Sequence, residues 1–135
     1  MVEMKVVYEG ELRTRVTHGP SGTAIETDAP VDNQGRGERL SPTDMVAAAL
    51  GACTLTVMGI AARRKGLALE GATARVEKHM VSEPVRRIGR LVVSFTLPAS
   101  LAPADRTILE RVFEQCPVRR SIHPDIAVEA TFTYR

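Results

Sequence analysis

Short stretches in which apolar and polar residues alternate recur along the chain, and a period of two predicts β-strands. In the first stretch, residues 2–8, one face carries Val2, Met4, Val6 and Tyr8. We expect further strands over residues 11–17, 23–27, 68–82 and 91–97, and from Ile126 to the end of the chain. Residues 28–40 are polar and contain two glycines, which is typical of a loop.

A long apolar segment without this alternation carries the signals of a helix start and a helix end. Ser41 is a suitable N-cap, Pro42 fits the first helical position, and Asp44 lies where a capping box places an acidic residue. The segment closes with basic residues and then Gly66, which favours a helix C-terminus. The pattern therefore predicts a helix that begins at Pro42 and ends just before Gly66.

A second helix is predicted over residues 103–115, where apolar residues recur at the spacing i, i+3, i+4 and i+7. This stripe consists of Leu109, Val112, Phe113 and Cys116. Pro117 fits the first position of a short following helix, which Pro124 would stop. The spacing thus points Cys116 into the apolar core.

The long helix is apolar on nearly every side, because no charged residue lies between Asp44 and Arg63. This length reaches the threshold for a membrane span, but the segment also contains threonines, glycines and many alanines, so we expect no membrane span. A helix of this kind must be covered all round. One six-stranded sheet covers only one of its sides, so we predict a homodimer in which the long helices pack against each other.

The composition is that of a soluble globular protein, with 44% hydrophobic and 25% charged residues in a chain of 135. This length predicts a single domain, residues 1–135. The net charge is only +2, aromatic residues are few and the basic residues form no stripe, so we expect no nucleic-acid partner. The first residues lack a basic segment followed by an apolar run, which predicts a cytoplasmic protein with reduced thiols.

The two cysteines are the strongest candidates for chemistry: Cys53 lies in the long helix and Cys116 lies at the junction of the two later helices. Two thiols on separate helices of one small domain could be a nucleophile and its resolving partner. They could equally be two buried apolar side chains, because unpaired cysteine is often buried. The spacing of the cysteines and of His18, His79 and His123 matches no zinc pattern, so we expect no metal.

A thiol inside an apolar helix has a raised pKa unless a cation lies near it. The candidate cations are arginines in the second strand, in the loop before the long helix and after the second cysteine, namely Arg13, Arg15, Arg36, Arg39, Arg119 and Arg120. For each of them a solvated surface charge is the alternative. Because Cys116 directly precedes Pro117, the start of the short helix would also favour a Cys116 thiolate.

Asp44 is the acidic residue that could reach a thiol. It lies nine residues before Cys53, so the two side chains point to roughly opposite sides of the helix, about 13 Å apart along its axis. In an antiparallel helix pair crossing near Ala48, Asp44 would pass close to Cys53 of the partner subunit. The alternative is that Asp44 only completes the capping box. Both roles are compatible, because a carboxylate has two oxygens.

Two motifs resemble the OsmC/Ohr family in their order and spacing. They are Ser41-Pro42-Thr43-Asp44-Met45, which continues through Ala48-Ala49-Leu50-Gly51-Ala52-Cys53-Thr54, and Cys116-Pro117-Val118. The likeness covers residues 41–135, whereas residues 1–40 agree only in strand pattern. It implies an α+β fold, with antiparallel sheets wrapped around long central helices in an intertwined homodimer. It also implies a thiol peroxidase of oxidative or osmotic stress defence that uses no metal or bound cofactor.

On this resemblance Cys53 is the peroxidatic thiolate, which an organic hydroperoxide oxidises to a sulfenic acid. Cys116 is then the resolving cysteine, and an external thiol or dithiol reductant must reduce the Cys53–Cys116 disulfide. The apolar surroundings favour alkyl or lipid hydroperoxides over hydrogen peroxide.

The family's peroxidases also pair an arginine with an acid. Asp44 is the match for that acid, although it lies one position nearer to Cys53 than the family's glutamate, whose place Thr43 holds. Arg36, in the loop that leads into the helix, is our choice for the arginine, and Arg13 is the second choice. These departures indicate a less typical branch.

Two other functions fit the same residues. One is a thiol redox protein of this family that acts on another sulfur species. The other is a non-catalytic dimer that binds a small ligand in a pocket lined by two cysteines. The shared apolar environment expected for both thiols favours chemistry.

Overall fold

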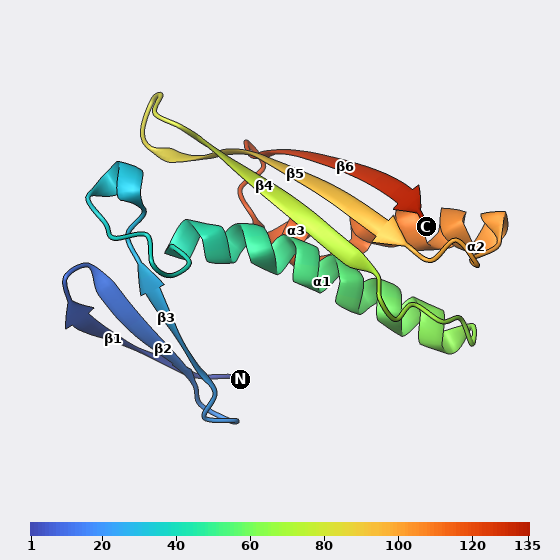
Figure 1. Ribbon diagram of the computed structural model, residues 1–135, viewed down its shortest axis with the longest axis horizontal. Helices are drawn as coiled ribbons and strands as arrows, with labels where there is room; N and C mark the ends of the chain where they lie inside the picture. The colour runs from blue at the N-terminus through green and yellow to red at the C-terminus, as the bar shows by residue number, and fades with distance from the viewer. The chain divides into compact units, whose positions relative to one another are not determined.

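Three strands, a long helix and three further strands follow one another along the chain, with short helices before the last strand (Figure 1). The structure is a computed structural model that describes residues 1–135. It divides into an N-terminal unit, Met1–Val46, and a C-terminal unit, Ala47–Arg135. The division falls in the first turns of the long helix. The expectation of a single domain stays a prediction.

The N-terminal unit is built on an antiparallel sheet with the strand order β1-β2-β3. Its strands are β1 (Met4–Gly10), β2 (Arg13–His18) and β3 (Ala24–Asp28), which confirms the three strands expected from alternation. Glu11 and Leu12 both have positive φ, 53° and 62°, as the tight β1–β2 turn requires. A short 3-10 helix, η1 (Val31–Asn33), lies in the loop that follows.

The long helix, α1 (Pro42–Arg64), begins and ends where its capping residues predict. The Ser41 N–H donates to Asp44 Oδ2 at 2.9 Å, and the Asp44 N–H donates to Ser41 Oγ at 3.0 Å, so the capping box is formed. At the other end Gly66 has a φ of 65°, and the Leu67 N–H donates to the Ala62 carbonyl at 2.8 Å. This left-handed residue after the last turn stops the helix.

The C-terminal unit contains a second three-stranded sheet with the order β4-β5-β6. The strands are β4 (Thr73–Val81), β5 (Arg87–Leu97) and β6 (Ala127–Tyr134). Three short helices lie between β5 and β6, namely α2 (Pro103–Val112), η2 (Phe113–Gln115) and α3 (Pro117–Ser121). The expected helix over 103–115 is thus an α-helix whose last turn tightens to 3-10 geometry.

The expected α+β architecture is confirmed, and two details of the strand arrangement differ from the expectation. The six strands form two sheets of three, and β6 runs parallel to β5, whereas β4 and β5 are antiparallel. The helices between β5 and β6 carry the chain back to the starting end of β5, so β6 enters the sheet in the same direction. Alternation fixes which face of a strand is apolar, but it does not fix the strand's neighbour or direction.

The core of the C-terminal unit lies between α1 and one face of this sheet. The buried residues of α1 recur every three or four positions and are Ala47, Leu50, Gly51, Thr54, Met58 and Ala62. A Cβ built on Gly51 would lie 2.9 Å from Val76 Cγ2 and 3.4 Å from Ala74 Cβ, so the helix approaches β4 closely there. Phe95 of β5 is fully buried in the same core.

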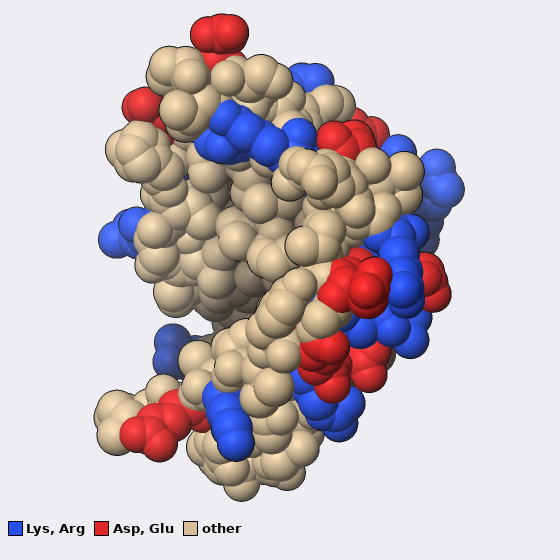
Figure 2. Space-filling view, turned by 90° about the vertical axis from the view of Figure 1, so that its left-hand side faces the viewer, with Lys and Arg blue, Asp and Glu red and all other residues tan.

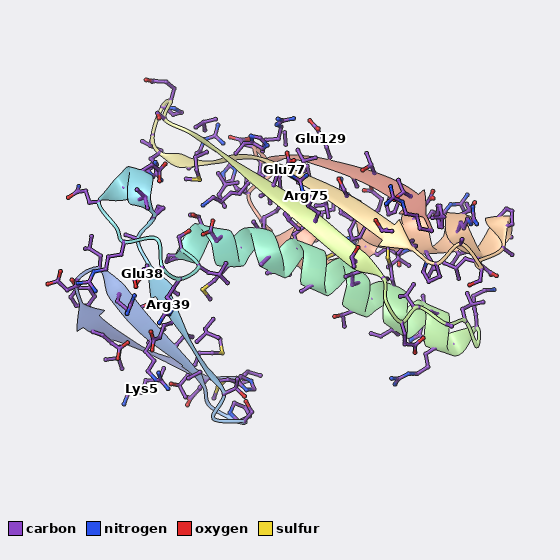
Figure 3. The ribbon with its side chains drawn as sticks, in the orientation of Figure 1. Lys5, Glu38, Arg39, Arg75, Glu77 and Glu129 are labelled. Carbon is purple, nitrogen blue, oxygen red and sulfur yellow. The ribbon has the colours of Figure 1, made fainter.

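The other face of the sheet is polar. Arg75 and Glu77 alternate with the core-facing residues of β4, and Glu129 occupies the equivalent face of β6 (Figure 3). Arg75 Nη1 lies 2.5 Å from Glu77 Oε1, and Arg90 of β5 pairs with Glu129 at 3.3 Å. This face therefore keeps its charges paired and solvated.

Charged residues are mixed in sign elsewhere as well. On the face that Figure 2 draws, basic and acidic side chains lie next to one another, and no broad area of a single sign is visible.

The helix α1 is long and apolar enough to cross a membrane, with a mean hydropathy of 2.0 over its most apolar window, of which 33% is buried. Here it serves as the core helix of the C-terminal unit. The C-terminal unit buries one stripe of it, and Val46 and Ile60 are 36% and 48% exposed. The C-terminal unit therefore does not bury α1 on every side, as the sequence analysis expects for so apolar a helix.

Candidate active site

Cys116 lies at the turn between η2 and α3, and an aromatic cluster holds that turn in the core. The ring of Phe113 packs edge-on against Phe95 and Phe132, with centroids 5.9 and 6.4 Å apart. The Cys116 N–H donates to the Phe113 carbonyl at 3.3 Å, and Pro117 begins α3. Cys116 is 0% exposed, as the apolar spacing of the second helix predicts.

Cys53 reaches the same place from α1. It is partly buried against the core, both cysteines are free, and the two thiols are near enough for each to shift the pKa of the other. The structure therefore brings together the two sulfurs that the sequence singles out. The roles of peroxidatic and resolving cysteine stay predictions.

The two thiols differ in how readily they ionise. Burial raises the pKa of Cys53 above its ordinary value of 9.0, and the neighbouring Cys116 sulfur raises it further, against one N–H donor, that of Val118. Burial also acts to raise the pKa of Cys116. Several donors outweigh it and lower that pKa, namely the Arg119 N–H, the Thr54 hydroxyl, the Cys53 thiol and the Val118 N–H. Within one chain the negative charge is thus favoured on the buried sulfur.

Two arginines of α3 lie beside this turn and are tied to Glu114. The guanidinium of Arg119 stacks over the Phe113 ring at 4.7 Å and forms an ion pair with Glu114. Its Nε is buried without a hydrogen-bond partner. Arg120 Nε donates to the Glu114 carbonyl at 3.2 Å. Arg119 and Arg120, two of the candidate activating cations, therefore hold the turn that carries Cys116.

Arg13, the second choice for the activating cation, is engaged by a buried acid. Its Nε and Nη2 donate to the two carboxylate oxygens of Asp28 at 2.7 and 2.9 Å. Asp28 is 2% exposed and also accepts the Glu38 N–H at 3.1 Å. The hydrogen bonds from Arg13 lower the pKa of Asp28 below its ordinary value of 3.8, and the same pairing raises the pKa of Arg13.

The other arginines of the N-terminal unit pair with surface acids. Arg36, our first choice, lies 3.6 Å from Glu11, and both side chains are more than half exposed. Arg15 and Arg39 both pair with Glu26, at 3.5 and 3.4 Å, and Figure 3 marks Arg39 in the loop beside β3. These arginines and the two thiols belong to different units, so the activating cation stays a prediction.

Asp44 has the capping role that the sequence indicates. One of its carboxylate oxygens, Oδ2, accepts the Ser41 N–H. Asp44 belongs to the N-terminal unit, and its predicted role toward a thiol stays a prediction.

Thr54 is a polar residue beside the thiols that the sequence analysis did not single out as a candidate. It is fully buried, its hydroxyl donates to the Leu50 carbonyl at 2.8 Å, and it also contacts Cys116. The available signal was a hydroxyl at a core-facing position of an apolar helix, next to Cys53. Buried hydroxyls require a hydrogen-bond partner, and Thr54 has one in the Leu50 carbonyl.

This arrangement suits reversible sulfur chemistry. Two free thiols in contact, one partly accessible and one buried with several donors, can exchange a proton and form a disulfide. No three His, Cys, Asp or Glu side chains of the structure are grouped so that they could hold a metal ion.

The sequence matches the family model described as OsmC-like protein over residues 35–131. Among solved structures, a candidate osmotic stress induced and detoxification response protein from Psychrobacter arcticus 273-4 is 42% identical, with a TM-score of 0.92; the match covers 98% of this chain and 96% of that one.

Other solved structures are similar at lower identity. An organic hydroperoxide resistance protein OsmC from Legionella pneumophila is 16% identical, with a TM-score of 0.78 and cover of 98% and 96%. The organic hydroperoxide resistance protein OhrB of Bacillus subtilis is 14% identical, with a TM-score of 0.69 and cover of 98% of each chain. These two likenesses show the fold. No curated protein matches the sequence.

Proposed function

Because the chain belongs to the OsmC-like family, we propose that it is a thiol-dependent peroxidase that reduces organic hydroperoxides. The observation that carries this proposal is the contact between the two free thiols of Cys53 and Cys116. Similar folds occur in proteins described as organic hydroperoxide resistance proteins, from Legionella pneumophila and Bacillus subtilis.

In the first step the Cys53 thiolate attacks the terminal oxygen of the peroxide. The O–O bond breaks, Cys53 becomes a sulfenic acid, and the alkoxide takes up a proton and leaves as an alcohol. Cys53 is assigned this step because it is partly exposed, whereas Cys116 is 0% exposed. The neighbouring Cys116 sulfur, whose pKa is lowered, can accept the Cys53 proton.

In the second step the Cys116 sulfur attacks the Cys53 sulfenic sulfur. The S–O bond breaks, hydroxide leaves and takes up the Cys116 proton as water, and a disulfide forms. An external thiol or dithiol then supplies two electrons and two protons to restore both thiols. The sum is one hydroperoxide and two thiols converted to one alcohol, one water and one disulfide.

The surroundings of the thiols support an apolar hydroperoxide as substrate. Cys53 packs against a core of aliphatic and aromatic side chains that includes Leu50, Met58 and Phe113. An alkyl or lipid chain would be desolvated favourably there, whereas hydrogen peroxide has no apolar group to bury. The activating cation is proposed to be an arginine, Arg36 or alternatively Arg13, which would stabilise the departing alkoxide with Asp44 as its acidic partner.

We also propose that the working form is a cytoplasmic homodimer in which the α1 helices pack against each other. Both units expose large apolar side chains, and those on the strands of the N-terminal unit are Met4, Val6, Tyr8 and Ile25. On α1, Val46 and Ile60 are exposed as well. Burying such residues in a second copy would supply the cover that one chain lacks.

The peroxidase proposal is tested by replacing each cysteine. We expect the reduced parent to consume an alkyl hydroperoxide and to lose two hydrogens in intact mass on forming the disulfide. Cys53→Ser should abolish consumption. Cys116→Ser should turn over once and then carry a sulfenic or over-oxidised Cys53, because no resolving thiol remains.

Peroxide loss and intact-chain mass are the two measurements. Consumption that survives in Cys53→Ser but not in Cys116→Ser would assign the attack to Cys116. A parent that leaves the hydroperoxide untouched while binding an apolar ligand would replace the proposal with a non-catalytic binding dimer.

A further inference from the structure

The Thr54 hydroxyl lies between two acceptors in the core of the C-terminal unit. Its Oγ1 donates to the Leu50 carbonyl at 2.8 Å, and the same hydroxyl is near enough to the Cys116 sulfur to lower the pKa of that thiol. Thr54 and Cys116 are both 0% exposed, so water does not compete for either group. A hydroxyl carries a single proton, and therefore Thr54 cannot donate to both acceptors at once.

Which acceptor receives the Thr54 hydroxyl proton must depend on whether Cys116 is a thiol or a thiolate. While Cys116 is a neutral thiol, its S–H can donate to Thr54 Oγ1, and the threonine proton stays on the Leu50 carbonyl. When Cys116 is a thiolate, the stronger acceptor is the sulfur, since hydrogen bonds to charged groups are the stronger ones. Rotation of the hydroxyl then costs little, because the Leu50 carbonyl keeps its backbone bond within the helix.

We propose that Thr54 is a positioning residue for the second half of the catalytic cycle: its hydroxyl turns from the Leu50 carbonyl to the Cys116 thiolate and holds that sulfur against Cys53. The proposal rests on the proposed function, in which the Cys116 sulfur displaces hydroxide from the Cys53 sulfenic acid. Thr54 neither gives nor takes a proton in that step. It stabilises the charged nucleophile and fixes its direction.

A purely structural role is the alternative, and the chain offers a matched control for it. Threonine in a helix commonly donates to the carbonyl four residues earlier. Thr56 does this on the same helix, donating to the Ala52 carbonyl at 2.8 Å, but it is exposed and contacts no cysteine. If the bond within the helix were the whole role of Thr54, removing either hydroxyl would have similar consequences.

Other charged or titratable groups around Cys116 come from each neighbouring element. They are the Cys53 thiol of α1, Glu114 of η2, and Arg119 and Arg120 of α3, which are tied to Glu114 as described above. Glu114, Arg119 and Arg120 are present in every variant compared, and residue 53 is the same in all chains of one experiment. A change in Cys116 ionisation between those variants therefore reports on the hydroxyl.

The first experiment titrates Cys116 alone, in a Cys53→Ser background, by thiolate ultraviolet absorbance and by the pH dependence of alkylation. We expect Thr54→Val to move the titration to higher pH, because a donor to the thiolate is lost. Thr54→Ser should restore it, and Thr56→Val should match its parent. Identical titrations for all four chains would overturn the proposal.

The second experiment follows a single turnover of the chains that retain Cys53, with one equivalent of an alkyl hydroperoxide. In Thr54→Val, sulfenic acid formation at Cys53 should keep the parent rate, and disulfide formation should be about threefold to tenfold slower. The rise in intrinsic nucleophilicity of a less acidic thiol offsets part of the lost thiolate. More Cys53 should become over-oxidised, and Thr54→Ser should rescue both effects.

The two experiments separate this inference from the proposed function. If the parent consumes no hydroperoxide, the peroxidase proposal fails, while the titration still decides whether Thr54 supports the Cys116 thiolate. If turnover occurs and Thr54→Val resolves at the parent rate, the positioning role is wrong although the peroxidase stands. Equal slowing in Thr56→Val would point to helix packing and would also overturn it.

Discussion

Asp28 is a buried residue that connects several parts of the N-terminal unit. Its carboxylate receives both guanidinium nitrogens of Arg13 and the N–H of Glu38, so it ties β2 and β3 to the loop before α1. A buried carboxylate is tolerated only when its oxygens are satisfied in this way. Sequence reasoning treated Arg13 as a candidate for chemistry and missed its partner.

The Asp28–Arg13 pair predicts an acid-dependent loss of stability. The folded-state pKa of Asp28 is lowered below its ordinary value of 3.8 by Arg13, so its contribution is fully present above the ordinary value. The contribution is lost as the pH falls through the folded pKa, because the unfolded chain binds the proton first. Urea unfolding of the parent, measured from neutral pH down through the folded-state pKa of Asp28, should show this fall in the free energy of unfolding.

The Asp28→Asn variant isolates that contribution. It should be less stable than the parent at neutral pH and should lose less stability on acidification, because the titrating group is gone. A variant whose stability falls with pH as steeply as the parent's would assign the acid sensitivity to other carboxylates.

At the scale of the elements, the packing of α1 against β4 depends on a glycine. Gly51 allows α1 to lie against β4, where Val76 and Ala74 fill the space that a side chain would need. A glycine inside a helix costs about 1 kcal/mol relative to alanine, so its presence here reflects the close contact.

Two alanine substitutions separate helix propensity from packing. Gly51→Ala should lower the free energy of unfolding by about 1 kcal/mol, because the clash with the stiff Val76 side chain outweighs the gain in propensity. Gly59→Ala, on the same helix, has no atom within 4 Å of its new Cβ. It should raise the free energy of unfolding by about 0.5–1 kcal/mol. Thermal or urea unfolding of both variants checks this, and a stabilised Gly51→Ala would contradict the close packing.

Element ends were predictable from local chemistry, whereas the pairing of elements was not. The capping box at Ser41 and the left-handed Gly66 fix the ends of α1, because those signals act within a few residues. The parallel entry of β6 depends on how far the intervening helices carry the chain, which no short motif encodes. The thiols were found by residue type, but Thr54 required the knowledge of which side of α1 meets Cys116.

For the whole molecule, the exposed apolar surface is the feature that supports the proposed dimer. One chain buries a single stripe of α1, and Ile60 on another side of it is 48% exposed. Isolated exposed apolar residues are ordinary, but a set of them on α1 and another on the strands of the N-terminal unit support the proposed interface.

The proposed dimer predicts a particle of twice the chain mass of 14.7 kDa in sedimentation at micromolar concentration. Ile60→Glu should weaken the dimer at least about tenfold, since burying an unpaired carboxylate is costly. Val85→Glu is the matched control, because Val85 is 63% exposed in the β4–β5 connection. A monomeric parent would remove the dimer proposal, and an unaffected Ile60→Glu dimer would move the interface away from α1.

The unequal exposure of the two cysteines predicts a direction for the regeneration step of the proposed cycle. In the proposed cycle a reductant would reach the partly exposed Cys53 first, because Cys116 is fully buried. The mixed disulfide would therefore form on Cys53, and the Cys116 thiolate would be the leaving group. Its charge would be stabilised by the backbone N–H groups of Arg119 and Val118. Recycling would begin at the sulfur that met the peroxide.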